Sequence, residues 1–309
     1  MGTVFLFSGQ GSQYPGMARE LTETYPKFLE IFNTAKRVLG FDLREACYAA
    51  PPEELSKTSI SQPAIMAASI IACEAAKARG LHFTAVAGHS LGEYAAMVES
   101  GMLSLEDGFK VIKARAAAMQ RASMIKPGSM CAILGKTADE VEEICYGIPE
   151  YVTPVNYNSP SQTVIAGTPE GIELAMEKFA EKGAKAVRLN VSAAFHSKLM
   201  QTAADEFITE IRNVKFNTPN CRFYSNVYGG ELHNFEHMPE LLAKHIVSPV
   251  KFTSELESLY GDGYDKYVEC GPGKVLTGLV KKTLKGVTAV NIENTDSLNK
   301  AVEIITAEE

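Results

Sequence analysis

The segment Ala85–Ala95 constrains the fold most strongly. It reads Ala-Val-Ala-Gly-His-Ser-Leu-Gly-Glu-Tyr-Ala, which is a short apolar run, the pattern Gly-x-Ser-x-Gly, and then good helix formers. The pattern predicts a strand that turns sharply into a helix, because Gly88 and Gly92 leave no Cβ atoms beside the turn. The positive end of the helix dipole then faces Ser90. We therefore expect Ser90 to be a nucleophile and the Leu91 N–H to be an oxyanion donor.

The outer parts of the chain alternate between short β-branched or aromatic runs and segments of helical periodicity, which is typical of an α/β fold. Strands are expected near Val4–Phe7, Thr84–Val86, Arg222–Ser225 and Asp265–Glu269. Helices are expected near Met17–Tyr25, Ala64–Arg79, Leu199–Arg212, Pro239–Ile246 and Phe252–Tyr260. These segments predict an α/β-hydrolase-like core with a parallel sheet.

The middle of the chain follows a different order, strand-helix-strand-strand-helix-strand, over Ser129–Leu134, Ala138–Tyr146, Val152–Asn156, Thr163–Ala166, Pro169–Lys182 and Ala186–Asn190. This βαββαβ order is typical of a ferredoxin-like unit. The breakers Lys126-Pro127-Gly128 mark its start. We expect residues 1–126 and 195–309 to form one large α/β domain, with residues 127–194 inserted as a small ferredoxin-like subdomain.

Composition and charge exclude several classes of function. The net charge of −7 argues against a general nucleic-acid binder, which needs a basic face to displace counterions from phosphates. Apolar stretches such as Pro63–Ala72 are interrupted and fall short of the roughly 20 residues of a membrane helix, and no signal-peptide pattern is present. Six cysteines without a Cys-x-x-Cys pair suit a reducing compartment. We expect a cytoplasmic protein with no membrane span.

A nucleophilic serine needs a general base, and the chain has six histidines. His196 is preferred because it follows the last strand of the inserted unit, in a loop from which a base can reach a serine on another element. A buried structural histidine is the alternative. His89 lies inside the elbow, where its side chain should diverge from Ser90 and serve packing or a polar contact. His233 and His237 are four residues apart but lack a third ligand, so we expect no metal site.

The usual acidic member of a hydrolase triad is missing from the pattern. No aspartate between Ser90 and His196 lies on an obvious strand-end loop, so the order serine, aspartate, histidine has no clear middle member.

Three further segments accompany the elbow and the Phe195-His196-Ser197 stretch. They are Phe7-Ser8-Gly9-Gln10-Gly11-Ser12-Gln13, Lys113-Ala114-Arg115-Ala116 and Gly271-Pro272-Gly273-Lys274-Val275-Leu276. In these five motifs the chain resembles the malonyl-CoA:acyl-carrier-protein transacylases of bacterial type II fatty acid synthesis. The resemblance is specific because the motifs occur in the same order over nearly the whole chain.

The resemblance implies roles for two polar residues. Gln10 would offer its backbone N–H beside that of Leu91 to form an oxyanion hole, with a turn-capping amide as the alternative. Arg115 would bind the free malonyl carboxylate in a bidentate fork, which a planar guanidinium can form and a lysine cannot. A solvated surface cation is the alternative, but the apolar neighbours of Arg115 indicate burial.

The resemblance also bears on four residues around the base and the cleft. The family orients its histidine through a main-chain carbonyl, and the matching residue here is His245, where family members commonly carry glutamine. Ser248 replaces their usual asparagine before the proline. Phe195 would crowd a branched acyl group, which disfavours methylmalonyl. Asn158 matches a segment that borders the cleft, with a turn-forming asparagine as an equal alternative.

The implied reaction is ping-pong transfer of a malonyl group from malonyl-CoA to the phosphopantetheine thiol of acyl carrier protein, through malonyl-Ser90. It needs no metal or redox cofactor, because the thioester is already activated. A monomer is compatible with the sequence. Acyl carrier proteins are acidic, so a local basic patch is expected. The best cluster, with a solvated helix face as its alternative, is Lys274, Lys281, Lys282 and Lys285.

Three alternatives stay open at this stage. A stand-alone acyltransferase that serves a polyketide synthase would share every motif. A serine esterase or thioesterase would use water to deacylate Ser90, although Arg115 argues against simple esters. A docking scaffold with a degenerate site is the non-enzymatic alternative, and the intact Ser90, His196, Gln10 and Arg115 argue against it.

Overall fold

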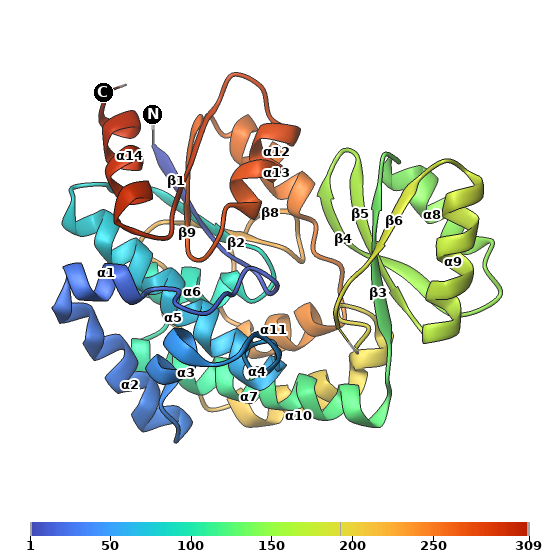
Figure 1. Cartoon of the computed structure of the whole chain (residues 1–309), viewed down its shortest axis with the longest axis horizontal. Helices are drawn as coiled ribbons and strands as arrows, with labels where there is room; N and C mark the ends of the chain where they lie inside the picture. Colours follow the sequence, from blue (N-terminus) through green and yellow to red (C-terminus); the bar gives the residue numbers. More distant parts are fainter. Residues whose placement is uncertain (1, 192, 308–309) are drawn as a thin grey trace.

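The computed structural model describes residues 2–191 and 193–307, and its ribbon separates into a larger and a smaller part (Figure 1). The larger part contains a sheet with the strand order β10-β9-β1-β2-β7-β8. Its strands are β1 (Thr3–Phe7), β2 (Ala85–Gly88), β7 (Arg222–Ser225), β8 (Gly230–Glu231), β9 (Lys266–Cys270) and β10 (Thr288–Ile292). The strands β1, β2, β7, β9 and β10 form parallel pairs with their neighbours, whereas β8 pairs antiparallel with β7.

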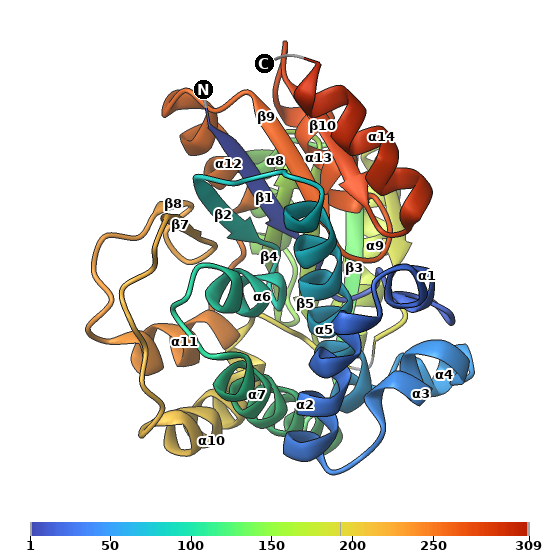
Figure 2. The same ribbon diagram turned by 90° about the vertical axis from the view of Figure 1, so that its left-hand side faces the viewer.

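Helices cover both faces of this sheet (Figure 2). Phe5 and Phe7 of β1 belong to a core cluster that includes α5 (Thr58–Ala78). The alternate residues Val4 and Leu6 pack in a second cluster with α12 (Phe252–Gly261) and α13 (Val275–Thr283). All five residues of β1 are buried, which explains its continuous apolar run, because a parallel strand covered on both faces has no polar side.

α5 is longer than the sequence indicated, since it runs for 21 residues through Pro63. Among the described residues it is the one helix long and apolar enough to cross a membrane, so the expectation that every apolar stretch falls short of that length was wrong. In the structure, 83% of the most apolar window of α5 is buried. Its apolar surface is therefore part of the protein core.

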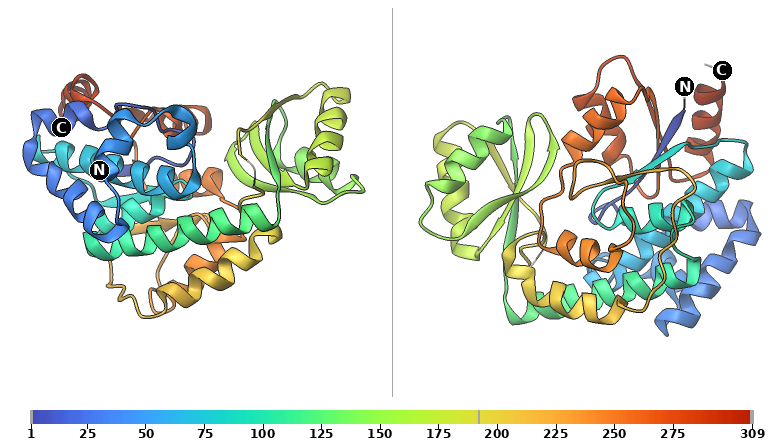
Figure 3. Two further views of the ribbon diagram at one scale, coloured as in Figure 1. Left: turned by 60° about the horizontal axis from the view of Figure 1, so that its bottom comes forward. Right: turned by 180° about the vertical axis from the view of Figure 1, so that it is seen from behind.

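The other helices of the larger part surround these layers. They are α1 (Arg19–Thr24), α2 (Leu29–Leu39), α3 (Leu43–Ala49), α4 (Pro52–Leu55), α6 (Gly92–Glu99), α7 (Leu105–Ile125), α10 (Gln201–Ile211), α11 (Met238–Ile246) and α14 (Thr295–Thr306). α7 packs along α10 and leads directly into the smaller part (Figure 3).

The smaller part is an antiparallel sheet with the strand order β4-β5-β3-β6. Its strands are β3 (Ser129–Leu134), β4 (Val152–Ser159), β5 (Gln162–Gly167) and β6 (Lys185–Arg188). The helices α8 (Ala138–Tyr146) and α9 (Pro169–Glu181) pack on it around a core that includes Ile133, Ile165 and Phe179. This order is that of a ferredoxin-like unit, so the predicted fold class is confirmed.

The two glycines of the elbow lie where a side chain has no space. A Cβ atom on Gly92, at the start of α6, would lie 2.1 Å from the carbonyl oxygen of Phe7 at the end of β1. A Cβ atom on Gly88 would lie 2.2 Å from the carbonyl carbon of Gly92. Both contacts are with backbone, which cannot rotate away as a side chain can. The glycines therefore let β1, β2 and α6 approach closely enough to form the turn.

We predict opposite effects for two glycine-to-alanine changes in helices. Gly92→Ala should lower the free energy of unfolding by about 1–3 kcal/mol or more, because the new methyl group overlaps the Phe7 backbone. Gly278→Ala in α13, where a Cβ would meet nothing within 4 Å, should raise it by about 0.5–1 kcal/mol through helix propensity. Urea unfolding of both variants measures this, and similar values for the two would contradict the steric argument.

Candidate active site

Ser90 occupies a strained turn between β2 and α6. Its φ of 53° lies in the left-handed region, which costs a non-glycine residue on the order of 1–3 kcal/mol and is found mostly at functional sites. His196 has a φ of 62°, so both residues share this unusual backbone conformation. The structure holds each of them in a conformation that places its side chain against the other.

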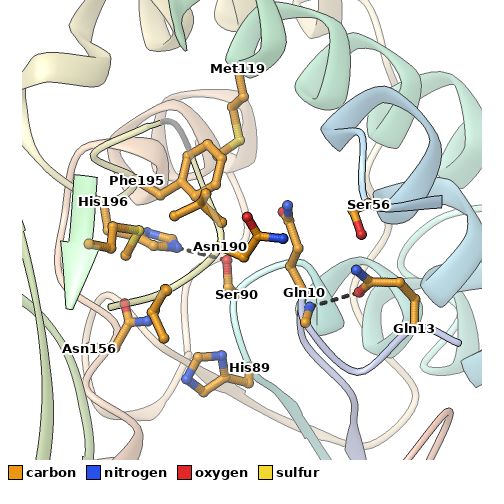
Figure 4. A pocket seen from close by; sticks show the side chains of 14 residues that line it. Gln10, Gln13, Ser56, His89, Ser90, Met119, Asn156, Asn190, Phe195 and His196 are labelled. Carbon is orange, nitrogen blue, oxygen red and sulfur yellow. Dashed lines mark hydrogen bonds between the residues drawn. The ribbon is translucent and has the colours of Figure 1, made fainter. Parts of the chain in front are cut away.

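The Ser90 Oγ atom lies 2.7 Å from the Nε2 atom of His196 (Figure 4). On the other side of the ring, His196 Nδ1 lies 3.0 Å from the main-chain carbonyl oxygen of His245, at the end of α11. A carbonyl oxygen can only accept, so Nδ1 carries the proton and Nε2 is left to accept from the Ser90 hydroxyl. The carbonyl therefore sets the tautomer that a general base requires, and the His245 side chain is not needed for it.

The electrostatic surroundings keep His196 uncharged. Burial, together with the nearby Arg115 cation, lowers the pKa of His196 to about 3, while the hydrogen bond to His245 opposes the shift. The charged form of a histidine is disfavoured in a buried site and beside another cation. His196 is thus neutral near pH 7 and free to accept a proton.

Arg115 projects from α7 into the same site and is only 1% exposed. Its Nη2 donates to Ser90 Oγ at 3.1 Å, and its guanidinium carbon lies 5.2 Å from the centre of the Tyr94 ring. Within the described residues, Arg115 has no salt bridge within 4.0 Å and its Nε has no hydrogen-bond partner. The carboxyl group that interacts with it through space, Glu93, has a pKa raised by burial to about 8 and is therefore mostly neutral near pH 7. A buried cation without an anion is costly. The site is therefore suited to a ligand that brings a carboxylate.

Among the described residues, two backbone N–H groups near Ser90 are unpaired. In the described part of the chain, the N–H groups of Gln10 and Leu91 have no hydrogen-bond acceptor. Gln10 follows β1, Leu91 precedes α6, and the side chain of Gln10 accepts from Gln62 Nε2 at 3.4 Å. Free donors at the ends of adjacent strands can stabilise an oxyanion that forms next to Ser90.

A cavity of about 460 Å³ opens over Ser90 and His196 (Figure 4). Phe195 and Met119 form an apolar part of its wall, and Gln10 lies across from His196. Its remaining lining residues come from the two parts of the fold and are Gly11, Gln13, Ser56, His89, Met130, Asn156, Leu189, Asn190 and Val191. Arg115 is not among the lining residues and contacts the cavity through Ser90 Oγ. The apolar wall, with this cation behind Ser90, suits a short acyl chain that ends in a carboxylate.

Asn158 is not among the lining residues, which include Asn156 and His89. The Asn158 side chain lies against the elbow, with its Oδ1 2.8 Å from His89 Nε2, so it borders the cavity through His89. Its role at the cleft stays a prediction. His89 is thus in a polar contact under the turn, as predicted.

A buried polar cluster that was not predicted from the sequence lies beneath Ser90. The Ser90 N–H donates to Asn226 Oδ1 at 2.7 Å, and Glu93 and Glu255 both contact Asn226. Burial raises the pKa of Glu93 to about 8 and that of Glu255 well above its usual range. One signal was available: Asn226 directly follows the predicted strand β7, and the carboxyl ends of parallel strands converge at such sites.

The remaining candidates lie away from the cavity. His233 and His237 are exposed, and in residues 2–191 and 193–307 no group of three or more His, Cys, Asp or Glu side chains could hold a metal ion. The lysines of the basic cluster, Lys274, Lys281, Lys282 and Lys285, are exposed on and next to α13. Their role in docking stays a prediction.

Comparisons with known proteins agree with this geometry. Residues 4–301 match the family model of the acyl transferase domain. The malonyl CoA-acyl carrier protein transacylase of Bacillus subtilis is 35% identical over 308 residues, which cover 98% of this chain and 97% of that protein. That of Escherichia coli strain K12 is 36% identical over 304 residues, which cover 97% of this chain and 98% of that protein.

Solved structures give the same result. The malonyl CoA-acyl carrier protein transacylase of Clostridium perfringens superposes with a TM-score of 0.95 at 37% identity, covering 100% of this chain and 98% of that one. A malonyl-transacylase in complex with its type II PKS acyl-carrier protein superposes with a TM-score of 0.94 at 34% identity, covering 98% and 100%. The chain belongs to the malonyl-CoA:acyl-carrier-protein transacylase family.

Proposed function

We propose that this protein transfers a malonyl group from malonyl-CoA to the phosphopantetheine thiol of acyl carrier protein. The observation that carries the proposal is the buried Arg115 guanidinium, 3.1 Å from Ser90 Oγ and without an ion-pair partner in the described residues. Acyl-CoA chains that lack a carboxylate would leave this charge buried and unpaired, which selects a dicarboxylic acyl group. The names of the relatives support the same donor and acceptor.

In the first half-reaction, Ser90 Oγ attacks the thioester carbonyl while His196 Nε2 takes the hydroxyl proton. The negative charge moves to the carbonyl oxygen, where the N–H groups of Gln10 and Leu91 stabilise it. The C–S bond then breaks, and the departing sulfur takes the proton from His196. The products are coenzyme A thiol and a malonyl ester of Ser90.

The second half-reaction runs the same steps with the carrier thiol. His196 removes the thiol proton, the sulfur attacks the malonyl ester, and the C–O bond to Ser90 breaks as His196 returns the proton to the serine oxygen. Each half exchanges one acyl bond for another, so no oxidant or metal is required. We infer that the protein acts as a cytoplasmic enzyme without a cofactor, and as a monomer.

The two parts of the fold correspond to two proposed structural units. We propose residues 1–126 and 195–309 as the large domain and residues 127–194 as the small subdomain; Met1, Ser192, Glu308 and Glu309 lie outside the described residues.

Phe195 and Met119 line the cavity and would leave little room beside the acyl carbon, which favours malonyl over methylmalonyl. A polyketide acyltransferase would use the same residues, and carrier preference distinguishes the two pathways.

We predict that malonyl-CoA forms a covalent adduct on Ser90. Intact-protein mass spectrometry of the mixture should show one added malonyl group on the native protein and none on Ser90→Ala, because the ester needs the serine oxygen. Ser56→Ala is the matched control, since Ser56 lines the same cavity, and it should keep the adduct. An unmodified native protein, or an adduct on Ser90→Ala, would contradict the mechanism. Rapid spontaneous loss of the adduct would favour a thioesterase.

We predict that Arg115 sets the preference for a charged acyl group. Arg115→Ala should slow malonyl transfer by at least about 100-fold, since loss of one partner of a buried charge pair costs about 3 kcal/mol or more, and its relative activity on acetyl-CoA should rise. Arg121→Ala on the same helix removes only an exposed pair with Glu206 and should keep native selectivity. An unchanged ratio of malonyl to acetyl rates in Arg115→Ala would remove this role.

We predict that acylation tolerates mild acid. Burial and Arg115 hold the pKa of His196 at about 3. The imidazole therefore stays neutral in mild acid and becomes protonated, and inactive as a base, only at much lower pH. The value of kcat/KM for malonyl-CoA, which reports the free enzyme, should stay level between about pH 8 and pH 5. A histidine with the ordinary pKa of about 6.5 would cause a drop of about tenfold at pH 5.5. Circular dichroism at each pH checks that the protein stays folded.

A further inference from the structure

Asn226 lies directly beneath Ser90, with no exposed surface. Its Oδ1 accepts from the Ser90 N–H at 2.7 Å, and its Nδ2 donates at 2.7 Å to the carbonyl oxygen of Gly88. Nδ2 also donates to Glu255 Oε2 at 2.7 Å. One carboxamide therefore satisfies the backbone groups on both sides of His89, at the position where the chain turns.

The carboxamide takes the place of a neighbouring strand. β2 and β7 pair through Ala85–Arg222 and Val86–Phe223, but beyond them the φ of 53° at Ser90 turns the backbone out of the strand direction. A strand can no longer pair with it there. The side chain of Asn226, the residue that follows β7, accepts from one backbone group and donates to the other, as a peptide unit would.

The backbone of Asn226 is itself held by two hydrogen bonds. Its N–H donates to Glu93 Oε1 and its carbonyl oxygen accepts from the Lys251 N–H at 3.0 Å. The second oxygen of Glu93, Oε2, lies 3.4 Å from His245 Nδ1, and the His245 carbonyl accepts from His196. The same buried cluster therefore contacts the turn that carries Ser90 and the residue that orients His196.

The chemistry at this position requires both a donor and an acceptor. An aspartate of the same shape accepts from the Ser90 N–H, but it has no hydrogen to donate when ionised and only one when protonated. It therefore cannot donate to both Gly88 and Glu255, as the Asn226 amide does. An alanine leaves both backbone groups buried without partners, and each such group costs about 1–3 kcal/mol. Either change weakens the set of contacts that opposes relaxation of Ser90 out of its strained conformation.

We propose that Asn226 is a positioning residue that holds Ser90 in the left-handed conformation from which its Oγ reaches His196. Because its Oδ1 occupies the Ser90 N–H, the hydrogen bonds to the oxyanion come from Leu91 and Gln10. Asn226 does not touch the substrate and acts through Ser90. The inference rests on the proposed acylation of Ser90.

The test is a single-turnover burst of coenzyme A release from malonyl-CoA, measured for the native protein, Asn226→Asp and Asn226→Ala. The amplitude counts active sites, and the rate constant reports acylation in those sites alone, so partial unfolding of a variant does not obscure it. We expect a rate constant lower by about 100-fold, the usual cost of a displacement of about 1 Å at a reacting group. The amplitude of Asn226→Asp should stay near native, and its KM for malonyl-CoA should change by less than about threefold.

Asn291→Ala is the matched control. Asn291 donates from Nδ2 to the Gly273 carbonyl oxygen at 3.2 Å, on strand β10 at the far edge of the same sheet, and its loss should leave the acylation rate constant native. A reduced amplitude with a native rate constant in both Asn226 variants would show a purely structural role and overturn the inference. The absence of a burst in the native protein would instead overturn the proposed function itself, so the two failures are distinguishable.

Discussion

The close approach of α6 to the ends of β1 and β2 is the contact on which the rest of the site depends. It exists because Gly92 places its backbone against Phe7 with no room for a methyl group. This contact brings the start of α6, the Gln10 loop after β1 and the Ser90 turn after β2 to one edge of the sheet. The positions of the proposed nucleophile and of both proposed oxyanion donors thus follow from one packing constraint between backbones.

A second constraint is electrostatic, and it gives the site a single charge. Burial lowers the pKa of His196 and raises the pKa values of Glu93 and Glu255. All three shifts favour the neutral form near pH 7, as expected for ionisable groups removed from water. The guanidinium of Arg115 is always protonated in proteins, so it keeps its charge. The buried site therefore holds one positive charge, and this charge is the physical basis of the proposed preference for a carboxylate.

Sequence reasoning located most elements of the fold because their patterns are local. Ser129–Leu134 and Ala138–Tyr146 agree with the structure to the residue, the second because Thr137 and Glu140 form a capping box. No strand was predicted at β10, because its five residues are short of a clear period-two pattern and only two of them are buried. The predicted start of α5 was too late, because Pro63 reads as a helix boundary although the helix continues through it.

Contacts between distant segments were harder to predict than motifs. Asn226 follows a short strand and belongs to no recognised motif. Its position beneath Ser90 depends on the pairing of β7 with β2, which local sequence patterns do not reveal. Asn158 was predicted to border the cleft from a motif, but the motif did not single out Asn156, which lines the cavity on the same irregular strand.

The position of Asn158 also explains how the inserted unit takes part in the chemistry. Its contact with His89 fastens β4 to the elbow. Further along β4, the Val250 N–H donates to Val155 and the Tyr157 N–H donates to Val250, at 2.8 and 2.9 Å, so the strand is also joined to the segment that follows His245. The small sheet is therefore bonded to the Ser90 turn and to the loop that orients His196. Met130 and Asn156 of the same sheet also line the cavity, so the small sheet contributes to the cavity wall as well as to the support of the proposed dyad.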